Sequence, residues 1–198
     1  MIAPFLLRSY PEVPVDRAQV LRYARCREED GGIGALLDAC VREAKGVFAG
    51  KVGYRMLPVK TDGAICDFSL FSLPSRDLAR ALDGCGRAVL FAATVGVGID
   101  RLIARYSRLS PAKALLFQAL GAQQVEAVCD AFCADLERET GAPLRQRFSP
   151  GYGDLALEVQ REVFTILDGK RIGVSLSESL LMTPSKSVTA FVGIPGNG

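Results

Sequence analysis

The chain has 198 residues, 49% of them hydrophobic, and its 24 Lys and Arg against 22 Asp and Glu leave a net charge of +2. This length and composition fit one compact domain with its own core and argue against disorder over most of the chain. The near-neutral balance argues against nucleic acid as the main partner. No histidine occurs, which excludes Ser-His-Asp and Cys-His catalysis, an HExxH zinc site and an imidazole base.

The first 82 residues predict an extended arm followed by short helices and strands. Asp16 can cap the first helix, and apolar residues recur at steps of three and four after Gly32. In chain order we expect an extended arm over residues 1–15, helices over 17–25 and 33–49, strands over 51–60 and 65–70 that pair across the turn at 61–63, and a helix over 75–82.

A continuous apolar run over residues 87–94 predicts a buried strand. The strand leads into Gly96-Val97-Gly98 and a helical stretch to Tyr106. This order opens a dinucleotide-binding fingerprint, but its third glycine position holds Arg101. We favour a tight strand-to-helix turn, and a nucleotide-binding Rossmann enzyme that takes NAD(P) remains an alternative.

A long helix is predicted from Ser110-Pro111 to about Thr140, with Gly141 ending it. Its apolar stripe consists of Leu116, Leu120, Val125, Val128, Phe132 and Leu136. A neighbouring polar line consists of Glu126, Asp130, Cys133 and Glu137. The CxxxC spacing of Cys129 and Cys133 lacks the third cysteine of an iron–sulfur motif, so we expect no cluster and no metal.

The six cysteines form no CxxC pair, and most lie among apolar or helical neighbours, as small buried hydrophobic residues do. The longest apolar stretch, residues 88–99, is about half a membrane span. A signal peptide begins with a basic region followed by an apolar core, and the first residues of this chain do not show that order. We therefore expect reduced thiols, a cytoplasmic location and no membrane association.

A Pro-Gly turn at residues 147–154, with the sequence RFSPGYGD, gathers one Arg, one Tyr and one Asp. Glycine lets a ligand approach the backbone, and a guanidinium can bind a carboxylate through two hydrogen bonds. A Tyr ring can accept a cation. The alternative is a connecting turn in which Arg147 and Asp154 pair with each other.

Residues 171–194 predict a C-terminal β-hairpin, because apolar residues alternate over 174–182 and again over 188–194. Glu178 falls on the apolar face of the first strand, where a carboxylate costs free energy unless it is paired or lines a site. Pairing with Arg171 or Arg161 is the alternative to a site.

The order RxxPGYxD, a helix over residues 155–167, and then LSES-x2-M-x-P-x2-SV resembles the reactivation domain of cobalamin-dependent methionine synthase. The match runs from about residue 120 to residue 194, and the remainder resembles the short, free-standing relatives of that domain. The resemblance implies a single C-shaped α+β domain over residues 1–198, with a largely antiparallel sheet flanked by helices; mixed helices and hairpins agree with that class.

This resemblance implies binding of S-adenosylmethionine (SAM) and docking over cobalamin that is supplied by a corrinoid-binding methionine synthase core. Reductive methylation of cob(II)alamin would then need an electron from a donor such as flavodoxin or ferredoxin. The protein would supply positioning and no catalytic residue, and it would have methionine synthase activity only together with its partner. The alternative is a non-catalytic docking module that shields or positions the partner's cobalamin.

Carried over position by position, the motif makes Arg147 the group that holds the SAM carboxylate, and Glu126 the acid that meets its amino group or sulfonium. Pro150, Gly151 and Tyr152 would form a turn whose backbone faces the nucleoside. Tyr152 would pack against SAM or reach toward the corrin.

Glu178 and Ser187 match the hairpin positions, which the resemblance assigns to the site edge or the corrin-facing surface. Thr183 stands where the fused domain has Trp, and the chain is expected to lack the C-terminal extension whose Tyr helps to bind SAM. The acidic SAM ligand of the fused domain's N-terminal part stays unassigned among Asp16, Asp62 and Asp67.

Overall fold

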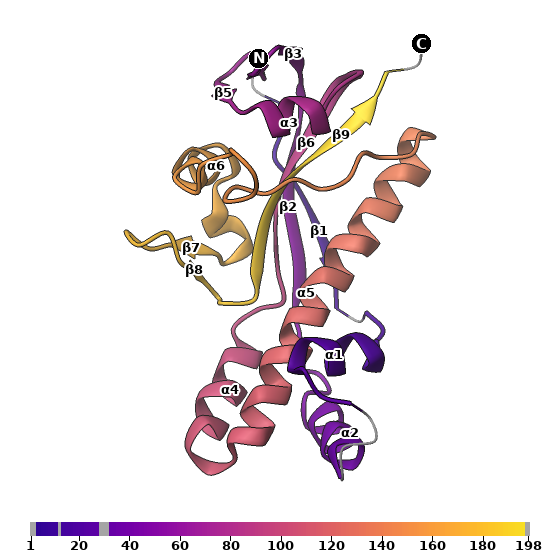
Figure 1. Cartoon of the computed structure of the whole chain (residues 1–198), viewed down its shortest axis with the longest axis vertical. Coiled ribbons are helices and arrows are strands. Elements are labelled where there is room, and N and C mark those ends of the chain that lie inside the picture. The colour runs from indigo at the N-terminus through magenta and orange to yellow at the C-terminus, as the bar shows by residue number, and fades with distance from the viewer. Residues whose placement is uncertain (1–2, 12, 28–31, 197–198) are drawn as a thin grey trace.

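The computed structural model describes residues 3–11, 13–27 and 32–196. A four-stranded antiparallel sheet with the order β1-β2-β6-β9 runs along the long axis of the molecule (Figure 1). Its strands are β1 (Leu6–Tyr10), β2 (Gly50–Pro58), β6 (Cys85–Thr94) and β9 (Ser187–Pro195). The predicted buried strand is confirmed as β6, which lies between β2 and β9.

Both faces of this sheet are covered, which explains why β6 is apolar at every position from Ala88 to Ala93. Val89, Phe91 and Ala93 belong to one hydrophobic cluster, and their neighbours Ala88, Leu90 and Ala92 belong to another. Because successive side chains of a strand point to opposite faces, the two clusters lie on the two sides of the sheet.

Helix α5 (Pro111–Thr140) covers the first face, and α1 (Arg17–Ala24), α2 (Ile33–Glu43) and α4 (Gly98–Leu109) pack on α5 and extend the same hydrophobic cluster (Figure 1). The long helix α5 has the predicted bounds and the predicted buried stripe, with Pro111 in its first turn and Gly141 ending it. Phe132 of α5 packs its ring 4.9 Å from Tyr54 and 5.1 Å from Phe91, measured between ring centroids. Helix α5 is therefore anchored on the middle of the sheet.

Smaller elements cover the second face, where Phe68 and Phe191 pack with 5.3 Å between their ring centroids. These elements are α3 (Arg76–Ala81), α6 (Val159–Leu167), the 3-10 turn η1 (Gly169–Ile172), the sheet β3 (Lys60–Asp62), β4 (Ile65–Asp67), β5 (Ser72–Pro74), and the pair β7 (Ser175–Leu176) with β8 (Met182–Thr183).

The N-terminal half departs from the predictions in three details. The extended arm contains β1, which pairs with β2 as an edge strand. Helix α2 ends at Glu43 instead of residue 49, because the chain turns before Gly50 to enter the sheet. Strand β4 pairs with β3 and β5, so the segment after residue 63 extends a separate small sheet instead of returning along β2.

The C-terminal hairpin is present, but it is the short pair β7–β8. Strand β9 was expected to close that hairpin and instead pairs with β6 over its whole length. Burial on both faces of the large sheet favours this arrangement, since β9 is buried at seven of its nine positions.

The Gly96-Val97-Gly98 turn does not belong to a nucleotide-binding βαβ unit, because both neighbours of β6 run antiparallel to it. Gly98 is needed for close packing, since a Cβ there would lie 2.5 Å from the carbonyl oxygen of Val47. The tight strand-to-helix turn is therefore the correct interpretation.

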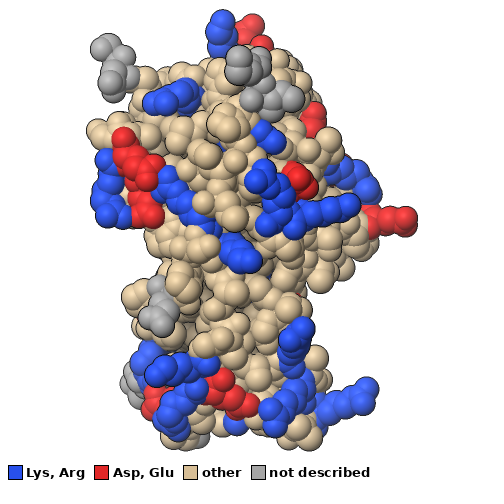
Figure 2. Space-filling view, turned by 180° about the vertical axis from the view of Figure 1, so that it is seen from behind, with Lys and Arg blue, Asp and Glu red and all other residues tan. Residues whose placement is uncertain are grey.

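The back of the molecule, seen in Figure 2, shows basic and acidic side chains next to one another in several groups, with uncharged surface between the groups. None of the helices in the described ranges combines the length and apolar character needed to cross a membrane. Within the same ranges, no group of three or more Cys, Asp or Glu side chains is arranged to hold a metal ion.

Candidate functional site

The polar line of α5 faces the coil that follows the helix. Glu126, Asp130, Cys133 and Glu137 all line one open hollow between α5, α3 and residues 144–152. They succeed one another at helical spacing, which places them on one side of α5 while its apolar stripe packs on the sheet. The predicted polar line thus becomes one wall of the hollow.

The coil is held in place by β9. Arg145 donates its backbone N–H to Gly193, and Phe148 and Phe191 exchange backbone hydrogen bonds of 2.9 and 2.8 Å. Phe148 packs against the cluster on the second face of the sheet, whereas Arg147 contacts α5. Because the backbone is extended, successive side chains point in different directions, and that of Arg147 points into the hollow.

Arg147 lies between two acids that are one helical turn apart. Its Nη2 lies 2.8 Å from Glu126 Oε2, and its Nη1 lies 2.6 Å from Asp130 Oδ1. Burial works to lower the pKa of the guanidinium, but the hydrogen bond to Asp130, with smaller electrostatic contributions, outweighs burial and leaves that pKa raised. Arg147 is thus a permanent cation with defined orientation.

The Pro-Gly turn is tied to α3 by Asp154. Its carboxylate accepts hydrogen bonds from the Ser75 hydroxyl and from the backbone N–H groups of Arg76 and Asp77. The alternative pairing of Arg147 with Asp154 is therefore wrong, because each has partners on a different helix. Gly153, with φ 53°, passes so close to Asp77 that a Cβ would lie 2.3 Å from its Oδ2.

Tyr152 stands at the rim of the hollow with 68% of its surface exposed. Gly151 has φ 92° and donates its N–H to the Leu155 carbonyl, which closes the turn. Pro150 is buried, and neither Pro150 nor Gly151 lines the hollow itself. The turn therefore holds Tyr152 out toward solvent beside Arg147.

The hollow has a volume of about 1110 Å³. Its charged lining consists of the acids Asp77, Glu126, Asp130 and Glu137 and the cations Arg80, Arg145 and Arg147. Groups of both signs can bind a zwitterionic ligand, and the volume exceeds what a ligand the size of a nucleoside requires.

Sequence reasoning missed Asp77, Arg80 and Arg145 as lining residues. Asp77 and Arg80 come from the short helix α3, whose first turn is bound by Asp154 and whose apolar residues pack in the second hydrophobic cluster. No local signal in the sequence marks that contact. The three candidates for an N-terminal acid, Asp16, Asp62 and Asp67, do not line the hollow, whereas Asp77 does.

Glu178 and Ser187 do not join this group. Glu178 lies in the exposed turn between β7 and β8, and its backbone carbonyl accepts a hydrogen bond from Arg161. The expected placement on an apolar strand face is wrong, because β7 ends at Leu176. Ser187 is buried; its hydroxyl donates to the Pro184 carbonyl and lies within hydrogen-bond distance of the Thr94 hydroxyl.

The thiols near the hollow are held in their neutral form. Burial raises the pKa of Cys133, and its contact with Arg147 offsets this only in part. Burial also raises the pKa of Cys129, which lies behind it on α5. All six cysteines are free in the structure. A thiolate nucleophile is therefore not a feature of this site.

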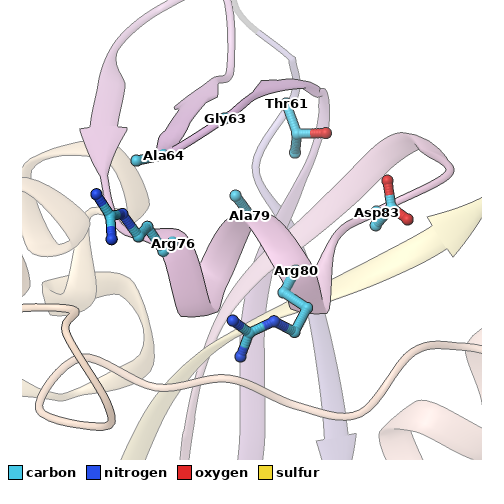
Figure 3. A pocket seen from close by; sticks show the side chains of 7 residues that line it. All are labelled: Thr61, Gly63, Ala64, Arg76, Ala79, Arg80 and Asp83. Carbon is cyan, nitrogen blue, oxygen red and sulfur yellow. The ribbon is translucent and has the colours of Figure 1, made fainter.

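A smaller hollow of about 590 Å³ lies on the other side of α3. Thr61 and Gly63 come from the small sheet, and Arg76 and Arg80 come from α3. Figure 3 shows the guanidinium of Arg80 directed away from Thr61 and well separated from that of Arg76. The polar groups do not converge, so the larger hollow is the candidate site.

Comparison with known proteins identifies a fold. No protein-family model matches the chain. No curated protein matches it either. Among solved structures, a crystal structure of the MetH reactivation domain bound to AdoHcy is similar, with a TM-score of 0.68 and 14% sequence identity. The similarity covers 99% of this chain and 80% of that one. The chain therefore has the fold of that domain, and the predicted α+β class is confirmed.

Proposed function

We propose that this chain reactivates cobalamin-dependent methionine synthase, using SAM that binds in the hollow beside the Pro-Gly turn. The observation that carries the proposal is the placement of Arg147 and Glu126 together at the base of that turn. The similarity to a reactivation domain that was crystallised with AdoHcy supports it.

The residues of the hollow fit the chemistry of SAM. The Arg147 guanidinium can bind the carboxylate of the ligand, and the Glu126 carboxylate can bind its ammonium group. The exposed ring of Tyr152 can pack on the ligand or on a docked partner. The acids on α5 and α3 suit the positive sulfonium. Pro150 and Gly151 contribute the shape of the turn.

The reaction asks little chemistry of this chain. A methyl group on sulfonium is already activated, so its transfer needs no general base. Cobalamin on the corrinoid partner would supply the nucleophilic cobalt after reduction by one electron from a donor such as flavodoxin or ferredoxin. The chain would bind and orient SAM, and the product would leave as AdoHcy.

A calorimetric titration tests the binding step. We expect SAM to bind the wild type, and Arg147→Ala to weaken binding about 10- to 100-fold, because hydrogen bonds to a charged group contribute about 1.5–3 kcal/mol. Arg138→Ala is the matched control, since Arg138 lies on α5 outside the hollow and 77% of its side chain is exposed. Equal affinity in wild type and Arg147→Ala would contradict the assigned ligand contact.

The same proteins are then mixed with a corrinoid-loaded methionine synthase core and a reductant. SAM consumption should appear only when the partner and the reductant are both present. SAM turnover by the isolated chain would contradict the proposal. Partner binding that neither SAM nor Arg147→Ala affects would instead identify a non-catalytic docking module.

A further inference from the structure

Arg147 is held by two acids that occupy different environments. Glu126 and Asp130 each bind one terminal nitrogen of the guanidinium, so both ends of the planar group are fixed. Glu126 is the more enclosed of the two, with 38% of its side chain exposed, against 68% for Asp130. A guanidinium has five N–H donors, so these two contacts leave others for a ligand.

The two acids do not hold the Arg147 guanidinium equally strongly. The contact to Asp130 is the shorter, at 2.6 Å against 2.8 Å. Its hydrogen bond is the strongest of the contributions that raise the pKa of the guanidinium, and Glu126 is not among the leading ones. Aspartate has one rotatable bond fewer than glutamate, so it loses less conformational entropy when it holds a partner. Asp130 is therefore the better anchor.

A ligand with an α-amino-acid end would replace one ion pair by two. The Arg147–Glu126 ion pair would break. Glu126 would then pair with the ammonium group of the ligand, and Arg147 would pair with its carboxylate. The net charge of the hollow stays the same, and no charge is left unpaired. This exchange requires that the guanidinium stays in place when Glu126 leaves it.

We propose that Asp130 is a positioning residue that keeps the Arg147 guanidinium oriented while Glu126 turns to the ammonium group of the ligand. This inference rests on the proposed function for the identity of the ligand. Asp130 touches no reacting atom, and its effect on ligand binding passes through Arg147.

Titration with two ligands separates an effect on the amino-acid end of the ligand from an effect on its nucleoside part. We expect Asp130→Asn to weaken SAM binding about three- to tenfold, the size of one partly exposed charged contact. Binding of 5′-methylthioadenosine, which lacks the amino-acid end, should stay the same. Asp130→Glu should restore most of the SAM affinity, because it restores the carboxylate. Glu137→Gln removes one charge from the same hollow without touching Arg147, since Glu137 accepts from the Leu144 backbone, and it measures the effect of charge alone.

Three results would overturn the inference: unchanged or tighter SAM binding in Asp130→Asn, equal weakening of 5′-methylthioadenosine, or an equal effect of Glu137→Gln. Thermal unfolding of each variant checks that the fold is kept; Asp130 is mostly exposed, so we expect no large change.

A ligand-free measurement keeps this inference separate from the proposed function. In ¹⁵N-labelled protein, the Nη–H signals of Arg147 should be resolved and slow to exchange in the wild type and in Glu126→Gln. In Asp130→Asn they should collapse, that is, merge and exchange rapidly with water. Collapse in Glu126→Gln alone would overturn the role of Asp130. Failure of the wild type to bind SAM with the partner present would reject the proposed function, whatever the Arg147 signals show.

Discussion

Asp154 connects two parts of the site that are far apart in sequence. Three hydrogen bonds to its carboxylate join the Pro-Gly turn to the first turn of α3, and the Ser75 hydroxyl also accepts from the Leu78 N–H as the helix cap. These bonds, that of Ser75 first, hold the pKa of Asp154 below its usual range. This connection places Asp77 next to the turn, and Asp77, Arg80 and Tyr152 line the same hollow.

Asp154→Asn should destabilise the protein at neutral pH and much less in acid. A lowered folded-state pKa means that Asp154 stabilises the fold fully above its unfolded-state pKa of about 3.9, and that this stabilisation is lost as the pH falls through the folded-state value. Urea unfolding at several pH values between neutral and acid checks this. Asp62→Asn is the control, because Asp62 lies exposed on β3 away from this network. A wild-type advantage that does not shrink in acid would contradict the explanation.

At the scale of elements, the start of α4 depends on close contact with the segment before β2. Gly98 opens α4 directly against Val47, whose carbonyl oxygen and side chain leave no room for a Cβ. Gly34 occupies a comparable place at the start of α2, where the nearest atom to an added Cβ is 3.9 Å away. The space around the backbone therefore requires glycine at position 98 but not at position 34.

Gly98→Ala should therefore lower the free energy of unfolding by about 1–3 kcal/mol, as overpacking of a tight contact does. Gly34→Ala should raise it by about 0.5–1 kcal/mol, because alanine favours a helix more than glycine does. Chemical unfolding of the two variants beside the wild type measures both changes. Equal effects of the two substitutions would show that the contact with Val47 does not limit residue 98.

At the scale of the whole molecule, two hydrophobic clusters lie on opposite faces of one sheet, and the same strands contribute to both. Phe132 lies in the cluster under α5, and Phe68 lies in the cluster under the small sheet, both fully buried. Strands β2, β6 and β9 contribute side chains to both. Loss of either cluster would expose one face of β6 to water, so neither is expected to persist alone.

We therefore expect the chain to unfold in a single transition, as one domain. Phe132→Leu and Phe68→Leu should each cost about 1–2 kcal/mol and lower the same transition, because each removes buried apolar contacts. Differential scanning calorimetry checks this through the agreement of the calorimetric and van't Hoff enthalpies. Two transitions, each sensitive to only one of the substitutions, would divide the chain into two domains.

Local patterns were sufficient for elements whose signals lie within a few residues. The cap at Ser110, Pro111 and the apolar stripe predicted α5 with its bounds, and the continuous apolar run predicted β6. Helical spacing and side-chain polarity carry this information, because they act between near neighbours along the chain. Arg147 and Glu126 were selected by the family resemblance, and the structure brings their two side chains together.

Contacts between segments far apart in sequence could not be predicted from local patterns and became visible only in the folded chain. The pairing of β9 with β6, the approach of α3 to the Pro-Gly turn, and the exposed turn that contains Glu178 have no local signature. An alternating apolar pattern is satisfied by any partner strand that buries the same face, so the pattern of residues 188–194 does not distinguish β8 from β6. Burial on both faces of the large sheet favours β6, and that choice carries Ser187 into the sheet and away from the hollow.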